Sequence, residues 1–290
     1  DDTELLLDYD FESANVNGNT VTNKGVKADS DATLVGSRGG KIQDGKLIFA
    51  RTGDYEYGKA DAENSYLSLP SDMYKGLDEF TLSIDVDYAD VYSYDNEGVR
   101  YSTTSLWHFT DVEPTGADTQ NRLEFEWYAS EISGAWKFFV YADDPAAWNQ
   151  NYATWFNTAA AAGKCVGDGG NVRYDDFNAQ QFTLSIVYKD NGYKVYWDDV
   201  QVYESGANTI YPANFAKFIV NRFGGMYYGR NAACGEFDNI KMWNKALSTE
   251  QLKANATRTE TQVITTGANE SVVAKVSEGT YTLPKVADVN

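Results

Sequence analysis

The sequence predicts an all-β fold in which two antiparallel sheets pack face to face as a β-sandwich. Two segments, Phe80–Tyr88 and Phe182–Tyr188, alternate apolar and polar residues, which is the pattern of strands with one buried face. The second segment is followed by the tight-turn sequence Asp190-Asn191-Gly192 and then by another alternating run, Tyr193–Trp197. A meander of this kind has one apolar face, and a second sheet is needed to cover it.

Shorter runs bounded by Gly, Pro, Asn and Asp account for the other strands. We expect strands within 5–12 and at 32–35, 46–50, 65–69, 105–109, 122–128, 136–141, 200–203, 218–221, 225–229 and 236–243. One short helix follows, with Ser248 as its N-cap, Gln251 completing a capping box, and Leu247 packed on Leu252. The segment 142–176 is a long insertion, and loops of that length usually carry function or are disordered.

The chain divides into two parts by composition. Residues 1–256 form the sandwich, and from 257 to 290 the sequence shifts to Thr, Val, Glu and Lys with no Trp. We interpret 257–290 as a linker and the start of a further β module, of immunoglobulin-like type, because one or two strands cannot close a core alone.

Net charge and the length of the apolar runs exclude some classes of binding partner. A net charge of -19 and a pI near 4.4 argue against nucleic acid and anionic membranes as partners. No run approaches the ~20 apolar residues of a membrane span. No signal peptide stands at Asp1, as expected for the mature or trimmed chain of a secreted or cell-surface protein. Cys165 and Cys234 are the only cysteines, and a disulfide and two buried thiols both stay open.

Four stretches in order resemble a known family. They are LLLDYDFE at 5–12, DEFTLSIDVDY at 78–88, FTLSIVYKDNGYKVYWDDVQVY at 182–203 and GEFDNIKMWNKALSTEQLKA at 235–254. Together they are similar to the laminin-G-like, concanavalin A-like jelly roll of bacterial secreted proteins. Asp85 stands where that family usually has Trp, and Asp199 replaces the Gly of its turn. The resemblance implies a jelly roll with a short C-terminal helix and a trailing β fragment. It also implies a module attached to glycoside hydrolases or adhesins, often glycan-binding and often holding one Ca²⁺.

The strand Glu124-Phe125-Glu126-Trp127-Tyr128 carries two carboxylates that alternation puts on one face. Laminarinase-type glucanases share the implied fold and use an E-x-D-x-E strand, whereas this chain has Tyr128 at the third position. A retaining glycosidase needs its second carboxyl group, so the motif favours a polar or sugar-contacting face over catalysis. His108, the only histidine, has no partner motif of a catalytic triad or zinc site, and we interpret it as a hydrogen-bonded sheet residue.

Aromatic side chains are the better indication of a ligand, since the chain has 7 Trp and 21 Tyr. Sugars stack their C–H faces on flat rings while polar groups meet their hydroxyls, so a mixture of the two is expected in a glycan site. The residues we expect to contact ligand are Trp148, Tyr152 and Trp155 in the long insertion, Tyr228 and Arg230 in a second cluster with Tyr227, and Glu126 and Asp85 on strands.

The resemblance also implies a structural Ca²⁺ near the opening and closing strands. The matching positions are Asp10, Glu12, the backbone carbonyl of Gly45, and Asp238. Carboxylate and carbonyl oxygens suit Ca²⁺. A hydrogen-bonding role for Asp238 at a strand edge is the alternative.

Three functions remain open at this point. The leading hypothesis is a non-catalytic, lectin-like carbohydrate-binding module of a secreted multimodular bacterial protein, which would hold an attached glycoside hydrolase near its glycan. A structural or adhesion domain that packs on a neighbouring module without binding sugar is the second, because protein interfaces are also rich in Trp, Tyr and Arg. A glycoside hydrolase of concanavalin A-like fold is the third.

Overall fold

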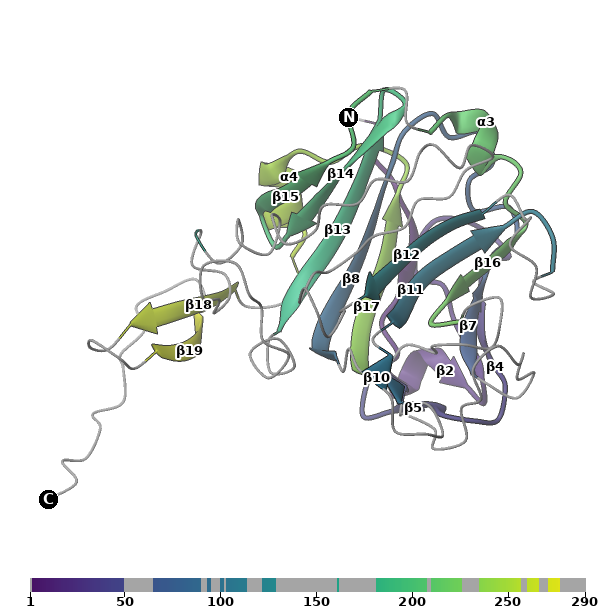
Figure 1. The fold of residues 1–290 in the computed structure, drawn as a ribbon. Coiled ribbons are helices and arrows are strands. Elements are labelled where there is room, and N and C mark those ends of the chain that lie inside the picture. The colour runs from purple at the N-terminus through teal and green to yellow at the C-terminus, as the bar shows by residue number, and fades with distance from the viewer. Residues whose placement is uncertain are drawn as a thin grey trace, which may run out of the picture.

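The computed structural model describes residues 2–49, 65–89, 93–94, 100–101, 103–113, 122–128, 161, 181–207, 210–225, 235–256, 260–265 and 271–276. These residues fold into two antiparallel sheets packed face to face, which confirms the predicted all-β sandwich (Figure 1). Two further strand pairs form separate ribbons: β9 (Ser93–Tyr94) with β10 (Arg100–Tyr101), and β18 (Glu260–Thr265) with β19 (Ser271–Val276).

The larger sheet, called sheet A here, has the strand order β5-β6-β17-β8-β13-β14-β15, with β1 also paired to β17. Its strands are β1 (Leu5–Tyr9), β5 (Gly40–Gln43), β6 (Lys46–Phe49), β8 (Phe80–Ala89), β13 (Phe182–Lys189), β14 (Gly192–Trp197), β15 (Val200–Glu204) and β17 (Gly235–Trp243). The central hairpin forms as predicted, with positive φ at Asp190 (53°) and Asn191 (61°).

The facing sheet, sheet B, has the order β12-β11-β16-β7-β4-β3-β2. Its strands are β2 (Val16–Asn17), β3 (Thr20–Val21), β4 (Ala32–Val35), β7 (Tyr66–Leu69), β11 (Thr103–Thr110), β12 (Arg122–Tyr128) and β16 (Val220–Phe223). A 3₁₀ turn, η1 (Ser13–Asn15), leads from β1 of sheet A into β2.

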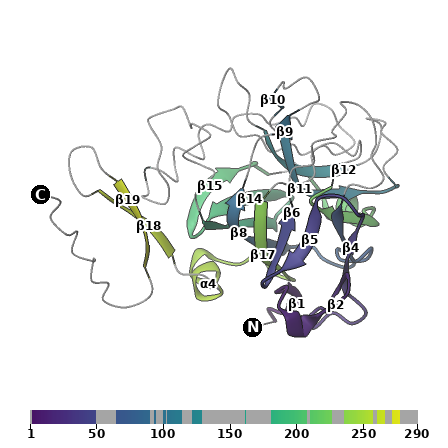
Figure 2. The ribbon, with the colours of Figure 1, turned by 90° about the horizontal axis from the view of Figure 1, so that it is seen from below.

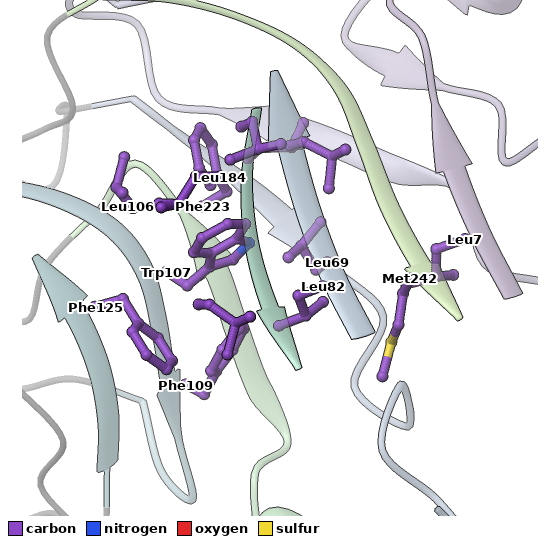
Figure 3. Close-up of a cluster of buried hydrophobic side chains, with 14 of the residues drawn as sticks. Leu7, Leu69, Leu82, Leu106, Trp107, Phe109, Phe125, Leu184, Phe223 and Met242 are labelled. Carbon is purple, nitrogen blue, oxygen red and sulfur yellow. The ribbon is translucent and has the colours of Figure 1, made fainter. Parts of the chain in front are cut away.

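Apolar residues from both sheets meet in one core. Figure 3 shows Trp107, Phe125 and Phe223 of sheet B and Leu82, Leu184 and Met242 of sheet A in the space between the sheets. Trp107 and Phe223 are fully buried with ring centroids 5.6 Å apart, in an edge-to-face arrangement. The period-2 alternation read from the sequence therefore identifies the inner faces of the described strands correctly.

A short helix covers part of the outer face of sheet A. This helix, α4 (Thr249–Ala254), begins at Ser248, whose Oγ accepts from the Gln251 N–H at 3.2 Å while Gln251 Oε1 accepts from the Ser248 N–H at 2.9 Å. The predicted capping box is thus confirmed. Below α4 lies a second buried cluster on the outer face: Val187, Tyr196, Trp243, Leu247 and Leu252. Figure 2 shows α4 beside this sheet and apart from sheet B.

The structure corrects the prediction at a few elements. It has a second short helix, α3 (Pro212–Phe215), where only one helix was expected. The strand expected at 218–221 starts later, as β16 at Val220, because the Phe218 N–H closes a turn onto the Phe215 carbonyl and both rings are buried. The strand expected at 136–141, both cysteines and residues 226–229 of the strand expected at 225–229 lie outside the described residues, and Gly225 itself is in no strand. No helix among the described residues is long and apolar enough to cross a bilayer.

The two ends of the sandwich lie at one corner. The Glu4 N–H donates to Asn244 Oδ1 at 2.8 Å, and the Asn244 N–H donates to the Glu4 carbonyl at 3.1 Å. Next to them, Leu5 and Trp243 are register partners in the β1–β17 pair. The chain thus enters through β1 and reaches α4 from the same end of sheet A.

Candidate functional site

The outer face of sheet B carries a row of polar residues in register across four strands. Ser68 of β7 pairs with Arg222 of β16, Arg222 with His108 of β11, and His108 with Glu124 of β12. On three of these strands a directly adjacent residue belongs to the core: Leu67 beside Ser68, Trp107 beside His108 and Phe223 beside Arg222 are all fully buried. Alternation therefore assigns Arg222 and His108 to the face away from the core.

Arg222 is held on this face by two neighbours. Its Cζ lies 4.0 Å from the ring centroid of Tyr66, which places the guanidinium over the aromatic face. One of its terminal nitrogens pairs with the Glu113 carboxylate. The Arg222 side chain is 10% exposed and that of Glu113 is 70% exposed, so the pair runs from the sheet to the surface. We call Tyr66, Glu113 and Arg222 the Arg222 cluster.

The cluster offers both kinds of hydrogen-bonding group. A guanidinium has five N–H donors in a rigid plane. Arg222 Nε is buried and has no hydrogen-bond partner in the part of the chain that the structure describes, so the terminal nitrogens are the donors nearer the surface. The exposed Glu113 carboxylate supplies acceptors. Because stacking on Tyr66 fixes the plane of the guanidinium, a ligand loses less side-chain entropy on binding it than on binding a free arginine.

His108 sits inside the sheet between Arg222 and Glu124 and is fully buried. This confirms its interpreted position in a sheet, and the hydrogen bonding of its ring stays a prediction. Burial removes the solvent access that a general acid or base needs. Its register pairing with Arg222 places it beside the cluster on the neighbouring strand.

The strand expected to carry a carboxylate face is confirmed in its bounds, as β12 spans Arg122–Tyr128. Leu123 and Phe125 are buried in the core. In register, Glu124 is opposite His108 and Glu126 is opposite Ser105, so the predicted ligand residue Glu126 belongs to the same sheet as the Arg222 cluster.

Asp85, the other predicted ligand residue on a strand, lies on the opposite sheet. It is 3% exposed on the outer side of sheet A, where its carboxylate accepts from Thr183 Oγ1 at 2.5 Å and from Asn239 Nδ2 at 2.8 Å. It lines a cavity of about 30 Å³ between sheet A and α4. The structure therefore does not bring Asp85 and Glu126 together.

The remaining predicted ligand residues lie outside the described part of the chain. They are Trp148, Tyr152, Trp155, Tyr228 and Arg230, and their roles stay predictions.

Among the residues predicted to bind metal, Asp10 lies in one environment, and Glu12 and Gly45 lie together in another. Asp10 is engaged by its own neighbours: Lys24 Nζ lies 2.7 Å from Oδ2, and Asn15 Nδ2 donates to both carboxylate oxygens at 2.9 and 3.0 Å. Burial opposes ionisation, but the hydrogen bonds from Lys24 and Asn15 outweigh it and hold the pKa of Asp10 below its usual value. Lys24 thus supplies the positive charge that faces this carboxylate.

Glu12 and Gly45 do lie together. A Cβ placed on Gly45 would be 2.9 Å from Glu12 Oε1, and the φ of 74° at Gly45 favours glycine there. Asp238 accepts from the Asn239 N–H at 2.7 Å beside a pairing irregularity of β17, which is an inner strand of sheet A, whereas a strand edge was expected. Among the described residues no three His, Cys, Asp or Glu side chains form a metal cluster. The fit for Ca²⁺ is therefore limited to the Glu12 carboxylate beside Gly45, and Asp10 does not fit.

Comparison with solved structures shows what this architecture is similar to. Domain 4 of AbnA, a GH43 extracellular arabinanase from Geobacillus stearothermophilus in complex with arabinotriose, matches with a TM-score of 0.51 and 11% identity. The match covers 88% of this chain and 98% of that domain. This chain has the fold of that domain.

Sialidase structures match over part of their length. Trypanosoma rangeli sialidase in complex with 2,3-difluorosialic acid matches with a TM-score of 0.51 and 13% identity, over 86% of this chain and 32% of the sialidase. The chain thus spans about a third of that enzyme. No family model and no curated protein matches the sequence. At these identities the likeness concerns the fold.

The Arg222 cluster was missed at the level of sequence. Its members lie at 66, 113 and 222, and they meet only because β7 and β16 pair and residue 113 follows β11. The local signal was weak but present: Arg222 stands between Asn221 and Phe223, which are both buried. A charged residue at the alternate position of an apolar strand marks the outer face of a sheet.

Proposed function

We propose that residues 1–256 are a non-catalytic carbohydrate-binding module of a secreted multimodular bacterial protein, whose sugar site is the outer face of sheet B around the Arg222 cluster. The observation that carries the proposal is the guanidinium fixed over Tyr66 and paired with the exposed Glu113. The module would hold an attached glycoside hydrolase close to its glycan.

The chemistry of the cluster suits a sugar. Each hydroxyl of a saccharide both donates and accepts hydrogen bonds, and the cluster presents N–H donors beside carboxylate acceptors. Charged partners make such bonds stronger than neutral ones, and they are already placed before the ligand arrives. The edge of Tyr66, which is partly exposed, adds apolar surface for a C–H face.

The similarity of the fold to a solved domain is independent support for the same proposal. The AbnA domain that this chain matches over 98% of its length was solved with arabinotriose bound. That domain comes from an extracellular arabinanase, which supports secretion and attachment to a hydrolase. We therefore take arabinotriose as the first ligand to test.

Binding through a separate module raises the concentration of the attached enzyme at its substrate without a new catalytic contact. The gain depends on the linker and on the affinity of the module. A module with millimolar affinity for one trisaccharide is sufficient when the polysaccharide offers many copies.

The test is calorimetric titration with arabinotriose, xylotriose and cellotriose, preceded by a glycan array. Arg222→Lys keeps the charge but loses the planar fork, so we expect at least about fivefold weaker binding, the value of one hydrogen bond. Lys75→Ala, at an exposed turn, is the matched control. Trp148→Ala and Trp155→Ala measure the contribution of the insertion.

Two results would contradict the proposal. Absence of binding across the array would favour the structural or adhesion role. Release of reducing sugar by the purified chain, lost in Glu124→Gln or Glu126→Gln, would instead establish a hydrolase.

A further inference from the structure

A second cavity lies on the other side of the sandwich, lined by residues of the β13–β14 hairpin, the end of β15 and the first residues of α4. Its volume is about 510 Å³, within the range of roughly 300–1,000 Å³ typical of small-ligand sites. It opens on the outer face of sheet A, whereas the Arg222 cluster lies on the outer face of sheet B. We call this cavity the α4 groove.

The floor of the α4 groove is apolar. Val187 and Tyr196 of sheet A and Leu247 before α4 line it, and all three are buried members of the outer cluster. A floor of this kind is suited to the C–H face of a sugar ring, which is apolar while the ring edge is polar.

The rim of the groove carries charges of both signs. Lys189, Lys194, Glu204 and Glu250 all line it, and Lys194 and Glu204 are register partners on the neighbouring strands β14 and β15. The Lys194 and Glu204 charged groups are 3.7 Å apart, with side chains 44% and 55% exposed, so both can reach a ligand. Asp190 also lines the groove, so three carboxylates stand beside two lysines, and the rim favours a neutral ligand with many hydroxyls over an anion.

Both walls are fixed without a ligand. Gly192 lies so close to the turn after β15 that a Cβ would be 2.3 Å from the Gly206 carbonyl oxygen. Tyr193 and Ser205 are joined by two hydrogen bonds of 2.9 Å. On the other wall, the Leu247 N–H donates to Thr81 Oγ1 at 2.9 Å. A preformed groove spares the ligand the cost of ordering it.

We infer that the α4 groove is a second binding site for a neutral oligosaccharide. The inference rests on the proposed function and extends it, because two sites on opposite faces would let one module engage two chains of a polysaccharide. Such bivalent binding strengthens attachment to an insoluble or branched glycan far more than either site alone.

The experiment is amide-detected NMR of the full chain titrated with arabinotriose. Signals of residues 190–194 and 246–251 report the α4 groove, and those of 220–223 report the Arg222 cluster. The double variant Lys194→Ala/Glu204→Ala removes an ion pair as a unit and leaves no unpaired charge. Its matched control is Lys27→Ala/Asp72→Ala, an ion pair of 3.0 Å at neither site.

We expect both sets of signals to shift in the wild type. In Lys194→Ala/Glu204→Ala the groove affinity should fall about fivefold or more while the Arg222 set still titrates, and Arg222→Lys should show the reverse. Binding to arabinan should weaken about tenfold or more in either variant, since one of two sites is lost. Thermal unfolding of each variant checks that the fold is kept.

The outcomes separate the two claims. Shifts confined to the Arg222 cluster, or groove shifts that survive Lys194→Ala/Glu204→Ala, would overturn the second site and leave the proposed function standing. Groove shifts alone would support the second site and overturn the Arg222 assignment. Equal groove shifts with glycerol would reduce the groove to a nonspecific polyol site and overturn the inference. No shift with any sugar would overturn both.

Discussion

Asn239 Nδ2 donates a hydrogen bond to Asp85 Oδ2 at 2.8 Å, which joins the irregular centre of β17 to its neighbour β8. Asn239 has a positive φ of 46° at this irregularity. From the other side, Thr183 Oγ1 of β13 donates to the same carboxylate at 2.5 Å. Asp85 therefore links three adjacent strands of sheet A from a position that is almost fully buried.

Replacing this carboxylate should weaken the fold. Asp85→Ala leaves the Thr183 hydroxyl and the Asn239 amide without their acceptor, and we expect the free energy of unfolding to fall by about 3 kcal/mol. Asp2→Ala, an exposed carboxylate, is the control and should change it by less than about 0.5 kcal/mol. Urea unfolding measures both. Unchanged stability with lost sugar binding would instead make Asp85 a ligand contact.

Gly192 should not tolerate a side chain. In Gly192→Ala the Cβ meets the Gly206 carbonyl oxygen, a backbone atom that cannot rotate away, so the turn after β15 must move. We expect a loss of about 2–3 kcal/mol in unfolding free energy and a distorted α4 groove. Gly76→Ala provides the comparison, since nothing lies near its Cβ and its cost of about 1 kcal/mol comes from a φ of 75°. Equal losses would show that the close contact is absent in solution.

The Asp10–Lys24 pair predicts a stability change in acid. The pKa of Asp10 is lowered in the folded chain, so its contribution is complete above the unfolded pKa of 3.8 and is lost as the pH falls through the folded pKa. Asp10→Asn should therefore cost about 1 kcal/mol near neutral pH, and the difference from wild type should shrink below pH 3.8. Thermal unfolding from neutral pH downwards measures it. A difference that stays constant through this range would contradict the assignment.

Calcium should act through Glu12 and not through Asp10. If the Glu12 carboxylate and Gly45 hold the proposed Ca²⁺, an excess of about 100 Kd raises the free energy of unfolding by about 2.7 kcal/mol relative to chelator. Glu12→Gln should remove that response, whereas Asp10→Asn should retain it, because Lys24 already faces Asp10. Calorimetric melting temperatures of the wild type and of both variants, with Ca²⁺ and with chelator, test this prediction. Identical melting temperatures in wild type would end the calcium proposal.

Local pattern was enough to predict the architecture. Alternation in Phe80–Tyr88 and in 122–128 placed β8 and β12, because inner residues of a sandwich must be apolar along each strand. The Ser248–Gln251 capping box placed α4, since its signal lies within four residues. The strands β2, β3 and β5 were missed because two to four residues are too few to show a period.

The site depended on contacts that sequence order does not show. Arg222 and Tyr66 meet through the pairing of β16 with β7, strands that are distant in the sequence. Asp85 was expected on a polar outer face, and alternation placed it there correctly. Its burial follows from α4 and the Asn239 irregularity, which cover that face. Which strands pair, and which helix lies over a sheet face, are decided by tertiary contacts. A periodic pattern within one strand therefore does not predict them.

The corner where Glu4 meets Asn244 governs how the sandwich responds to tension. A pull through the flanking chain acts at Leu5 and Trp243, which are paired neighbours at one end of antiparallel strands. Once α4 detaches, the force opens the β1–β17 hydrogen bonds one after another, as a zipper opens, instead of loading them all together. A pull at this corner should therefore separate β1 from β17 at a lower force than simultaneous rupture of the same hydrogen bonds would need.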